Sequence, residues 1–313
     1  MPMKSISEHV FDRATFEVWA NPLRDALERD AAKVLQTDDA RYATLVAAMN
    51  YAVTGGGKRI RALLSYAAGA LTGGVASDLR RVALALEFVH AYSLIHDDLP
   101  CMDNDTLRRG KPTCHVKFGV GEAMLAGDAL QPEAFLLLTD LDITEAARLK
   151  ILTTFAKACG RDGMCGGQAI DLEHVGKKID LALLREMHSK KTGALITAAI
   201  MMGALCGEAE KFQRAEPSLQ KFSSAMGLGF QVIDDILDVT STAATLGKTA
   251  GKDAENNKPT YVSLIGLEAS EKLAQETLKE ALSALEELQV AGFDFSSLTH
   301  LADLAYYMIG RTK

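Results

Sequence analysis

Two long segments of this chain are apolar on nearly every side, and each carries a cluster of aspartates. Residues 78–98 end in Asp97-Asp98, and residues 221–239 contain the sequence DDILD, which begins at Asp234. A helix that is apolar all round lies at the centre of its fold. Carboxylates are rarely buried there unless they are paired or bind a metal. The pattern therefore predicts two central helices whose acidic ends open into a cavity.

The rest of the sequence also favours helices. Of the 313 residues, 48% are hydrophobic and only 7 are proline. No stretch alternates apolar and polar residues as a half-buried strand would. Apolar patterns of helical length are separated by glycine-rich or proline-containing turns, without a long linker or an internal repeat. We predict an all-α fold of ten or more helices.

Charge, cysteine content and hydropathy argue against several classes of protein. The chain has 34 basic and 41 acidic residues, which argues against nucleic acid as its main partner. Its five cysteines include no CxxC pair, so we expect neither a disulfide framework nor a zinc site, and we predict a cytoplasmic protein. The N-terminus lacks the apolar core of a signal peptide. The longest apolar run, residues 193–206, is too short for a membrane span and is expected to form a buried helix.

The acidic clusters suit a hard divalent cation. Asp234 and Asp238 are four residues apart and therefore share a helix face. Asp103 returns in the loop after Asp97 and Asp98, because Pro100 disfavours a helix beyond that point. Carboxylates on one face repel each other unless a cation lies between them, and ligand sets made only of oxygen suit Mg²⁺. One such cluster would be ordinary for a solvated helix end, whereas two in apolar helices favour metal binding.

Basic residues follow a pattern that matches these acids. The candidates are Lys58, Arg59 and Arg61, Arg108 and Arg109, Lys190 and Lys191, and Lys248, Lys252 and Lys258. Each alone would be an ordinary surface cation, but together they suggest a diphosphate held between metals and cations. The glycines before Lys58 lack the spacing of a Walker A loop, which disfavours an ATPase. His90, two turns before Asp97, is either a core histidine or a donor to a phosphate.

These motifs together resemble the trans-isoprenyl diphosphate synthases, and most closely the bacterial farnesyl diphosphate synthases. The segments that carry the resemblance are GGGKRIR (55–61), HAYSLIHDDLPCMDNDTLRRGKPTCH (90–115), AGDAL (126–130), GMCGGQAIDL (163–172), HSKKTGAL (188–195), GLGFQVIDDILDV (227–239) and TLGKTAGKD (245–253). The resemblance implies an isoprenoid synthase-type helical bundle around a deep central cavity. It also implies one polyprenyl synthase domain over residues 1–313 and a homodimer.

The resemblance assigns expected roles to particular residues. The ligands of three Mg²⁺ ions, for which Mn²⁺ could substitute, would be Asp97, Asp98, Asp103, Asp234, Asp235 and Asp238. The allylic diphosphate would be held by Arg108, Lys191 and Lys248, with Lys258 nearby. Isopentenyl diphosphate would be held by Lys58, Arg61, His90 and Arg109. Thr192 and Gln231 would lie beside the developing carbocation, with Gln168 and Asp171 supporting that wall.

The implied reaction is ionisation, condensation and elimination. Dimethylallyl or geranyl diphosphate would ionise, and the double bond of isopentenyl diphosphate would attack the resulting cation. In the family, an aromatic residue at the position of Tyr92 goes with a C15 product, farnesyl diphosphate, and Ser93 lies one helical turn before Asp97. Residues 249–258 and the C-terminal tail are candidate lids.

Several alternatives remain, and one of the departures from the family, at Pro132, bears on the fold. The nearest alternative is a geranylgeranyl diphosphate synthase, with the same chemistry and a C20 product. A non-catalytic regulatory subunit could dispense with its metal clusters, but both clusters are intact here. A terpene cyclase would typically combine Asn or Asp with Ser or Thr and Glu in its second metal motif, which DDILD does not match. Pro132 falls where the family continues a helix, and we expect it to kink or break that helix.

Overall fold

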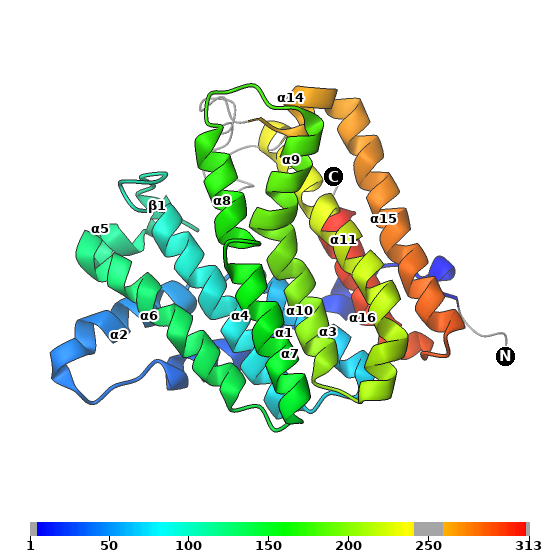
Figure 1. Ribbon diagram of the computed structural model, residues 1–313, viewed down its shortest axis with the longest axis horizontal. Coiled ribbons are helices and arrows are strands. Elements are labelled where there is room, and N and C mark those ends of the chain that lie inside the picture. Colours follow the sequence, from blue (N-terminus) through cyan, green and yellow to red (C-terminus); the bar gives the residue numbers. More distant parts are fainter. Residues whose placement is uncertain (1–4, 241–258, 311–313) are drawn as a thin grey trace.

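The computed structural model describes residues 5–240 and 259–310, and these are almost entirely helical (Figure 1). The prediction of an all-α fold with ten or more helices is confirmed. The elements in chain order are η1 (Ile6–Glu8), α1 (Arg13–Val34), η2 (Ala40–Tyr42), α2 (Ala43–Val53), α3 (Ile60–Thr72), α4 (Ala76–Asp97), β1 (Leu107–Arg108), β2 (Lys111–Pro112), α5 (Cys114–Phe118), α6 (Val120–Thr139), α7 (Glu145–Cys159), α8 (Met164–Glu173), α9 (Leu181–His188), η3 (Ser189–Gly193), α10 (Ala194–Leu205), α11 (Ala209–Thr240), α14 (Tyr261–Ile265), α15 (Leu267–Val290) and α16 (Phe295–Ile309).

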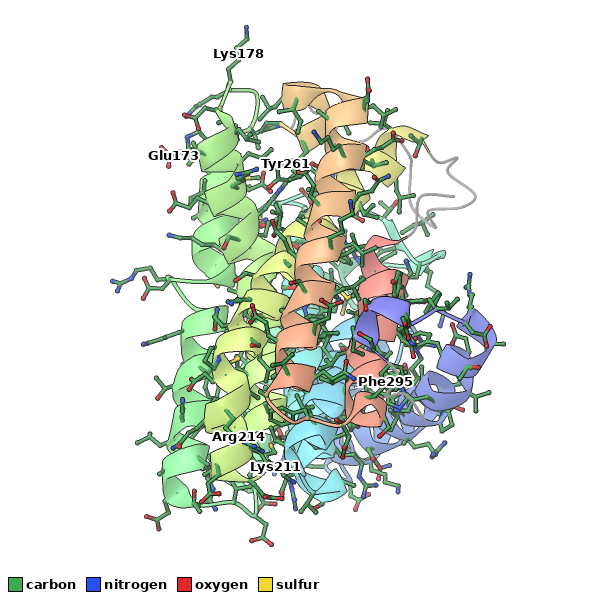
Figure 2. The ribbon with its side chains drawn as sticks, turned by 90° about the vertical axis from the view of Figure 1, so that its right-hand side faces the viewer. Glu173, Lys178, Lys211, Arg214, Tyr261 and Phe295 are labelled. Atoms are coloured by element: carbon green, nitrogen blue, oxygen red, sulfur yellow. The ribbon has the colours of Figure 1, made fainter. Side chains whose placement is uncertain are left out.

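The segments predicted to be central do form the core. The first is α4, and the second is the C-terminal half of the longer helix α11. The long apolar run is α10, whose side chains are nearly all buried. At Gly203 the α10 backbone lies against α3, because a Cβ there would stand 2.2 Å from the carbonyl oxygen of Ser65. Figure 2 shows α15 lying along α11, which completes the cover of this core.

The expectation that Pro132 would break its helix is wrong. Helix α6 continues through Pro132 to Thr139. Both Pro132 and Asp128, the residue four positions earlier, are exposed in the single chain, so the carbonyl that loses its partner lies on the outer face of α6 and not in the core. The opposite face of α6 buries Leu130, Ala134 and Leu138 in the core and holds the helix together. In the part of the chain that the structure describes, no helix combines the length and apolarity that crossing a membrane requires.

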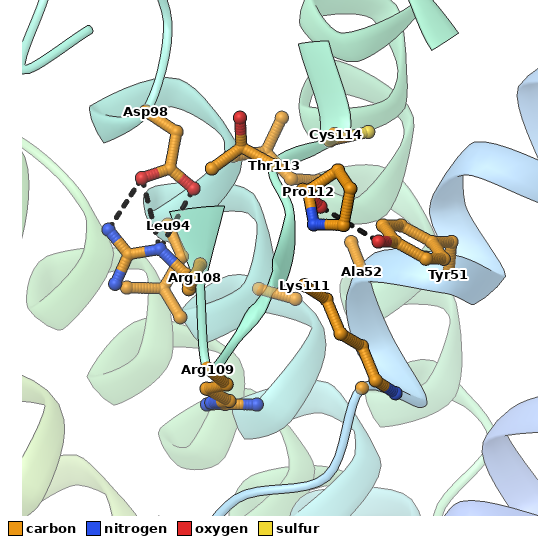
Figure 3. A pocket seen from close by; sticks show the side chains of 13 residues that line it. Tyr51, Ala52, Leu94, Asp98, Arg108, Arg109, Lys111, Pro112, Thr113 and Cys114 are labelled. Carbon is orange, nitrogen blue, oxygen red and sulfur yellow. Dashed lines mark hydrogen bonds and ion pairs between the residues drawn. The ribbon is translucent and has the colours of Figure 1, made fainter. Parts of the chain in front are cut away.

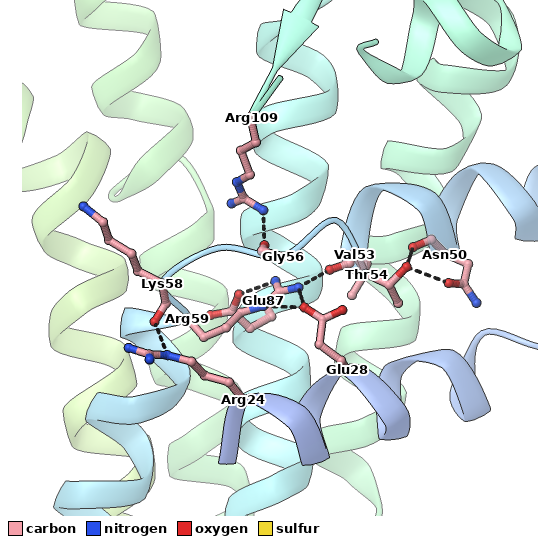
Figure 4. Close-up of polar contacts among 10 residues, drawn as sticks. All are labelled: Arg24, Glu28, Asn50, Val53, Thr54, Gly56, Lys58, Arg59, Glu87 and Arg109. Atoms are coloured by element: carbon pink, nitrogen blue, oxygen red, sulfur yellow. Dashed lines mark hydrogen bonds and ion pairs between the residues drawn. The ribbon is translucent and has the colours of Figure 1, made fainter. Parts of the chain in front are cut away.

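The loop between α2 and α3 is fixed by a buried network of ion pairs (Figure 4). Arg59 has a left-handed backbone with φ 51° and is only 6% exposed. Its guanidinium donates to Glu87 at 2.9 Å, and also to Glu28 and to the carbonyl oxygen of Val53. Glu87 is 2% exposed, so the pair is shielded from water. Arg59 therefore stabilises the core, whereas its neighbours in the basic stretch were expected to bind ligand.

Replacement of Arg59 by methionine should destabilise the fold strongly. Arg59→Met keeps much of the apolar stem but leaves Glu87 buried without its cation. We expect the free energy of unfolding, measured by urea denaturation, to fall by about 3–5 kcal/mol. The matched control is Arg41→Met, because the Arg41 side chain is 85% exposed beside Asp39. It should cost less than about 1 kcal/mol. Equal, small losses in the two variants would contradict the role given to Arg59.

Candidate active site

A cavity of about 950 Å³ opens between α4, α8 and α11. A volume near this size accommodates a substrate with a long apolar chain. It is lined by most of the site residues expected from the sequence. These are Arg61, His90, Tyr92, Ser93, Asp97, Asp103, Arg108, Arg109, Gln168, Asp171, Lys191, Thr192, Gln231, Asp234, Asp235 and Asp238. The exceptions among the described residues are Lys58 and Asp98, while Lys248 and Lys258 lie outside the residues that the structure describes.

The first aspartate cluster lies where α4 ends. The amide of Asp103 donates to the carbonyl oxygen of Asp97 at 2.9 Å, so the loop folds back over the helix end. Burial raises the pKa of the Asp97 carboxyl, Lys191 lowers it, and Asp103 raises it again. A raised pKa means that the negative charge of Asp97 is not fully compensated by its surroundings. The position therefore favours a bound cation.

Asp98 does not line the main cavity, and it pairs with Arg108 (Figure 3). The Arg108 Nε donates to Oδ2 of Asp98 at 2.8 Å, and a terminal nitrogen donates to Oδ1 at 2.6 Å. Asp98 is 3% exposed and borders a small separate pocket of about 60 Å³. This two-point geometry fixes the orientation of the guanidinium. In this arrangement Asp98 orients Arg108, and Arg108 also lines the main cavity.

The hairpin β1–β2 carries the paired arginines. Its turn residues Arg109 and Gly110 have φ of 53° and 73°, as a tight two-residue hairpin turn requires. The Tyr51 hydroxyl donates to the carbonyl oxygen of Pro112 at 2.7 Å and ties the hairpin to α2. The hairpin that carries the arginines is therefore anchored to α2. The sequence showed no strand pattern here, and the two-residue strands are too short to give one.

The second aspartate cluster occupies the last two turns of α11. Asp234 is exposed at the cavity, whereas Asp235 and Asp238 are buried. Oδ2 of Asp235 accepts a hydrogen bond from the backbone amide of Tyr261 at 2.7 Å. That amide belongs to the first residue of α14, so Asp235 holds the start of this helix against α11. Asp234 and Asp238 share the face expected from their spacing.

Lys191 and Thr192 lie in a π-helical turn, η3, between α9 and α10. Wide turns of this kind are frequent at functional sites. The Lys191 ammonium donates to Oδ2 of Asp171 on α8 at 2.6 Å. A Cβ at Gly167 would stand 2.1 Å from the amide nitrogen of Lys191, so α8 rests directly on the backbone of this turn. The glycines of the GMCGGQ segment therefore serve close packing.

Replacement of Gly167 by alanine should destabilise the protein. Glycine to alanine inside a helix ordinarily stabilises by about 0.5–1 kcal/mol. Here the added methyl group meets backbone atoms of η3, and we expect a loss of about 1–3 kcal/mol in the free energy of unfolding. Gly121→Ala is the control, because nothing lies within 4 Å of a Cβ at that helical position. If Gly167→Ala were as stable as Gly121→Ala, the close approach would be refuted.

A second wall of the cavity is cationic. Burial lowers the pKa of the Arg109 guanidinium, and the charge of Arg59 lowers it further. Burial, followed by the charges of Arg61 and Arg109, holds the pKa of His90 well below its ordinary value, so this imidazole is neutral at pH 7. Within the described chain, the buried Nε of Arg61 has no hydrogen-bond partner. Mutually repelling cations with an unused donor favour a bound anion.

The structure adds residues that sequence reasoning did not single out. His96, His188, Met124, Met164 and Cys165 all line the cavity. The histidines had little support in the sequence, because apolar neighbours are equally typical of core positions. Met164 and Cys165 stand inside the GMCGGQ segment but have no distinguishing spacing of their own. Lys58, in contrast, is exposed on the loop before α3.

The carboxylates fit a divalent cation that is shared with a ligand. In the chain as described, no three His, Cys, Asp or Glu side chains converge closely enough to hold a metal by themselves. Asp97 and Asp103 come from one side of the cavity, and Asp234 and Asp238 come from α11. Such oxygen donors suit Mg²⁺, which commonly completes its shell with water and substrate phosphates. The donor set and the under-compensated Asp97 are consistent with that ion.

Comparison with known proteins agrees with this geometry. The Escherichia coli (strain K12) farnesyl diphosphate synthase is 48% identical over 272 residues, which cover 86% of this chain and 90% of that protein. The large subunit 1 of a heterodimeric chloroplastic geranylgeranyl pyrophosphate synthase of Arabidopsis thaliana is 43% identical, covering 84% of this chain and 71% of that protein. The apo crystal structure of an FPP/GFPP synthase from Zymomonas mobilis superposes with a TM-score of 0.81 at 36% identity, covering 95% of this chain and 99% of that one.

A family model described as polyprenyl synthetase matches residues 42–291. The matched span includes every described residue of the cavity wall. The relatives and the solved structure are similar over most of both chains, so the likeness concerns the whole fold. The chain therefore belongs to the polyprenyl synthetase family.

Proposed function

We propose that this protein is a prenyltransferase that condenses isopentenyl diphosphate with dimethylallyl or geranyl diphosphate to make farnesyl diphosphate. The observation that carries the proposal is the division of one cavity into three chemical parts. One part is acidic, one is cationic, and the third holds uncharged side chains such as Tyr92, Met124 and Met164. Two diphosphates and a hydrocarbon chain are the ligands that these parts would suit together. The similarity to farnesyl diphosphate synthases supports the same activity.

The allylic diphosphate is assigned to the acidic part. Asp97, Asp103, Asp234 and Asp238 would hold Mg²⁺, with three ions expected and Mn²⁺ as a substitute. Bound there, the ions would neutralise charge on the diphosphate. Lys191 and Arg108 would contact its oxygens, already oriented by Asp171 and Asp98. Asp98 and Asp235 thereby act through Arg108 and α14, and direct ligation of metal by these two carboxylates stays a prediction. Binding of the same diphosphate by Lys248 and Lys258 stays a prediction.

Isopentenyl diphosphate is assigned to the cationic wall. Arg61 and Arg109 carry charge that lacks full compensation, and a neutral His90 can donate one hydrogen bond to a phosphate oxygen. The hydrogen bond from Arg109 to the carbonyl oxygen of Gly56 aims its guanidinium before any ligand arrives. Lys58 would add charge from the rim. Anion binding by oriented guanidinium groups is strong and directional.

The chemistry needs no nucleophilic side chain. The carbon–oxygen bond of the allylic diphosphate breaks, and the double bond of isopentenyl diphosphate attacks the allylic cation. A proton then leaves for the departing pyrophosphate. Thr192 and Gln231 line the cavity, and their side-chain oxygens can stabilise positive charge in transit. Water must stay out, because it would capture the cation.

Removal of either acidic cluster should abolish turnover. With Mg²⁺, labelled isopentenyl diphosphate and dimethylallyl diphosphate, the protein should yield mainly a C15 alcohol after dephosphorylation, and chelation with EDTA should stop the reaction. Asp97→Asn or Asp234→Asn should each lower kcat by at least about 100-fold, because several kcal/mol of charge stabilisation is lost.

The control for this assay is Asp162→Asn, an exposed aspartate whose side chain is 69% accessible outside the cavity. It should retain full activity. A dominant C20 product would instead favour the geranylgeranyl diphosphate synthase alternative. No metal-dependent product at all would favour the regulatory-subunit alternative and refute the proposal.

We also infer that the protein is a homodimer that joins through α6. This helix lies on the outside of the bundle beside α5 (Figure 1). Leu125 and Leu136 on α6 are 54% and 60% exposed, and Val116 and Val120 continue the apolar surface. An apolar stripe of this kind marks an interaction site, and a second copy of the same chain is the commonest partner.

Leu136→Glu should convert the dimer to a monomer. The interface is self-complementary, so each of the two subunits would bury one carboxylate in it. Sedimentation equilibrium should show twice the chain mass for the unchanged protein and a single chain mass for the variant. Leu149→Glu on α7, where the leucine is 66% exposed, should stay dimeric. A monomeric unchanged protein would contradict the inference.

We further propose that residues 1–313 form a single domain that works in the cytoplasm. The buried residues of the described helices belong to one continuous apolar cluster. The cysteines are all free, as a reducing compartment would leave them.

A further inference from the structure

A phenol and a thiol from two different helices meet in the wall of the cavity. The Tyr92 hydroxyl lies 3.4 Å from the Sγ of Cys165. Tyr92 is on α4, five residues before Asp97, and Cys165 is in the first turn of α8. Both residues line the cavity, and their contact joins its two sides.

Neither member of this contact is an acidic or basic side chain, although Asp97 acts on Tyr92 and Oδ1 of Asp128 lies 3.8 Å from Nε2 of His96. Burial raises the pKa of the Tyr92 hydroxyl far above neutrality, so the group stays protonated. Met164 and Met124 line the same cavity, and the His96 ring packs edge-on against Tyr92 with centroids 5.6 Å apart. On α4, Tyr92 and His90 are separated by about 200° and therefore point to nearly opposite sides of the helix. A hydrocarbon tail would suit this part of the cavity better than a diphosphate.

The first turn of α8 has little freedom to move away from the cavity. A Cβ at Gly163 would stand 2.2 Å from the carbonyl oxygen of Ala158, and one at Gly166 would stand 1.9 Å from that of Arg161. Gly167 rests on the backbone of η3 in the same way. A larger side chain at position 165 therefore has to project into the cavity, because the backbone around it is already in contact.

We propose that Cys165 is a specificity-determining residue that, together with Tyr92, limits the length of the prenyl chain. The proposal rests on the proposed function. The diphosphate of the growing product would be held near Asp97, about 7.5 Å along the axis of α4 from Tyr92. A tail that grows away from this end reaches the Tyr92–Cys165 contact and must stop there or separate it. Cys165 thus supplies the second half of a floor whose first half is the aromatic ring.

Substitutions at Cys165 should shift product length in both directions. Cys165→Leu fills the end of the cavity, and the ratio of C10 to C15 product should rise by at least about tenfold, as expected when one side chain excludes one hydrocarbon unit. Cys165→Ala opens the floor, and a C20 product should appear. The measurement is chromatography of dephosphorylated products made from labelled isopentenyl diphosphate, with KM for isopentenyl diphosphate determined in parallel and expected to stay unchanged.

The matched thiol control is Cys206→Ala. Cys206 follows α10, is buried, and does not line the cavity, so its replacement should leave the product ratio as it was. In a Tyr92→Ala background, which should lengthen the product, Cys165→Leu should shorten it again. That reversal would show that both residues bound the same space.

The outcomes separate this inference from the proposed function. Normal turnover with an unchanged C10, C15 and C20 distribution in Cys165→Leu would overturn the role of Cys165 and leave the prenyltransferase intact. If circular dichroism shows that Cys165→Leu does not fold, Cys165→Ala decides, and an unchanged C15 to C20 ratio would overturn the inference. Absence of any product from the unchanged protein would refute the proposed function instead.

Discussion

The compensation of charge inside one cavity is the constraint on which this structure depends. Carboxylates and guanidinium groups removed from bulk water destabilise a fold unless each has a partner. Glu87 has Arg59, Asp98 has Arg108, and Asp171 has Lys191. Each of these pairs joins two different elements or loops, so the same contacts that neutralise the charges also hold the walls of the cavity in place.

The charges that lack full compensation indicate which ligands the cavity would bind. Burial and Asp103 leave the Asp97 carboxyl with a raised pKa, whereas burial and Arg59 leave the Arg109 guanidinium with a lowered one. The raised pKa of Asp97 favours a bound cation, and the lowered pKa of Arg109 favours a bound anion. A metal diphosphate beside the acidic clusters and a free diphosphate beside the arginines would satisfy both. The pattern of unsatisfied charge thus supports the proposed pair of substrates without reference to any single motif.

Much of the fold could be predicted from the sequence, because the decisive patterns are local. The continuous apolar character of α4, α10 and the C-terminal half of α11 and the break at Pro100 depend only on neighbouring residues. The expectation for Pro132 failed because it took account of the lost hydrogen bond alone. The buried face of α6 and the open carbonyl side, which together allow the helix to continue, are tertiary features.

The sequence predicted which residues belong to the site, but not which residues each of them pairs with. The sequence indicated that the stretch around Lys58 is cationic, yet only the structure shows that Arg59 turns inward to Glu87. Likewise, the sequence treated Asp98 and Asp235 as equal to their neighbours, whereas the first holds Arg108 and the second holds the start of α14. Side-chain direction at a helix end depends on what packs against it, and that information is not local.

The unsatisfied charges of the cavity should bind a metal diphosphate. Isothermal titration of the full chain with inorganic pyrophosphate, with Mg²⁺ and again after treatment with EDTA, measures this binding. We expect saturable binding in the presence of Mg²⁺ and an affinity at least about tenfold weaker without it, which corresponds to about 1.4 kcal/mol. Equal affinity with and without Mg²⁺, or no binding with Mg²⁺ present, would contradict it.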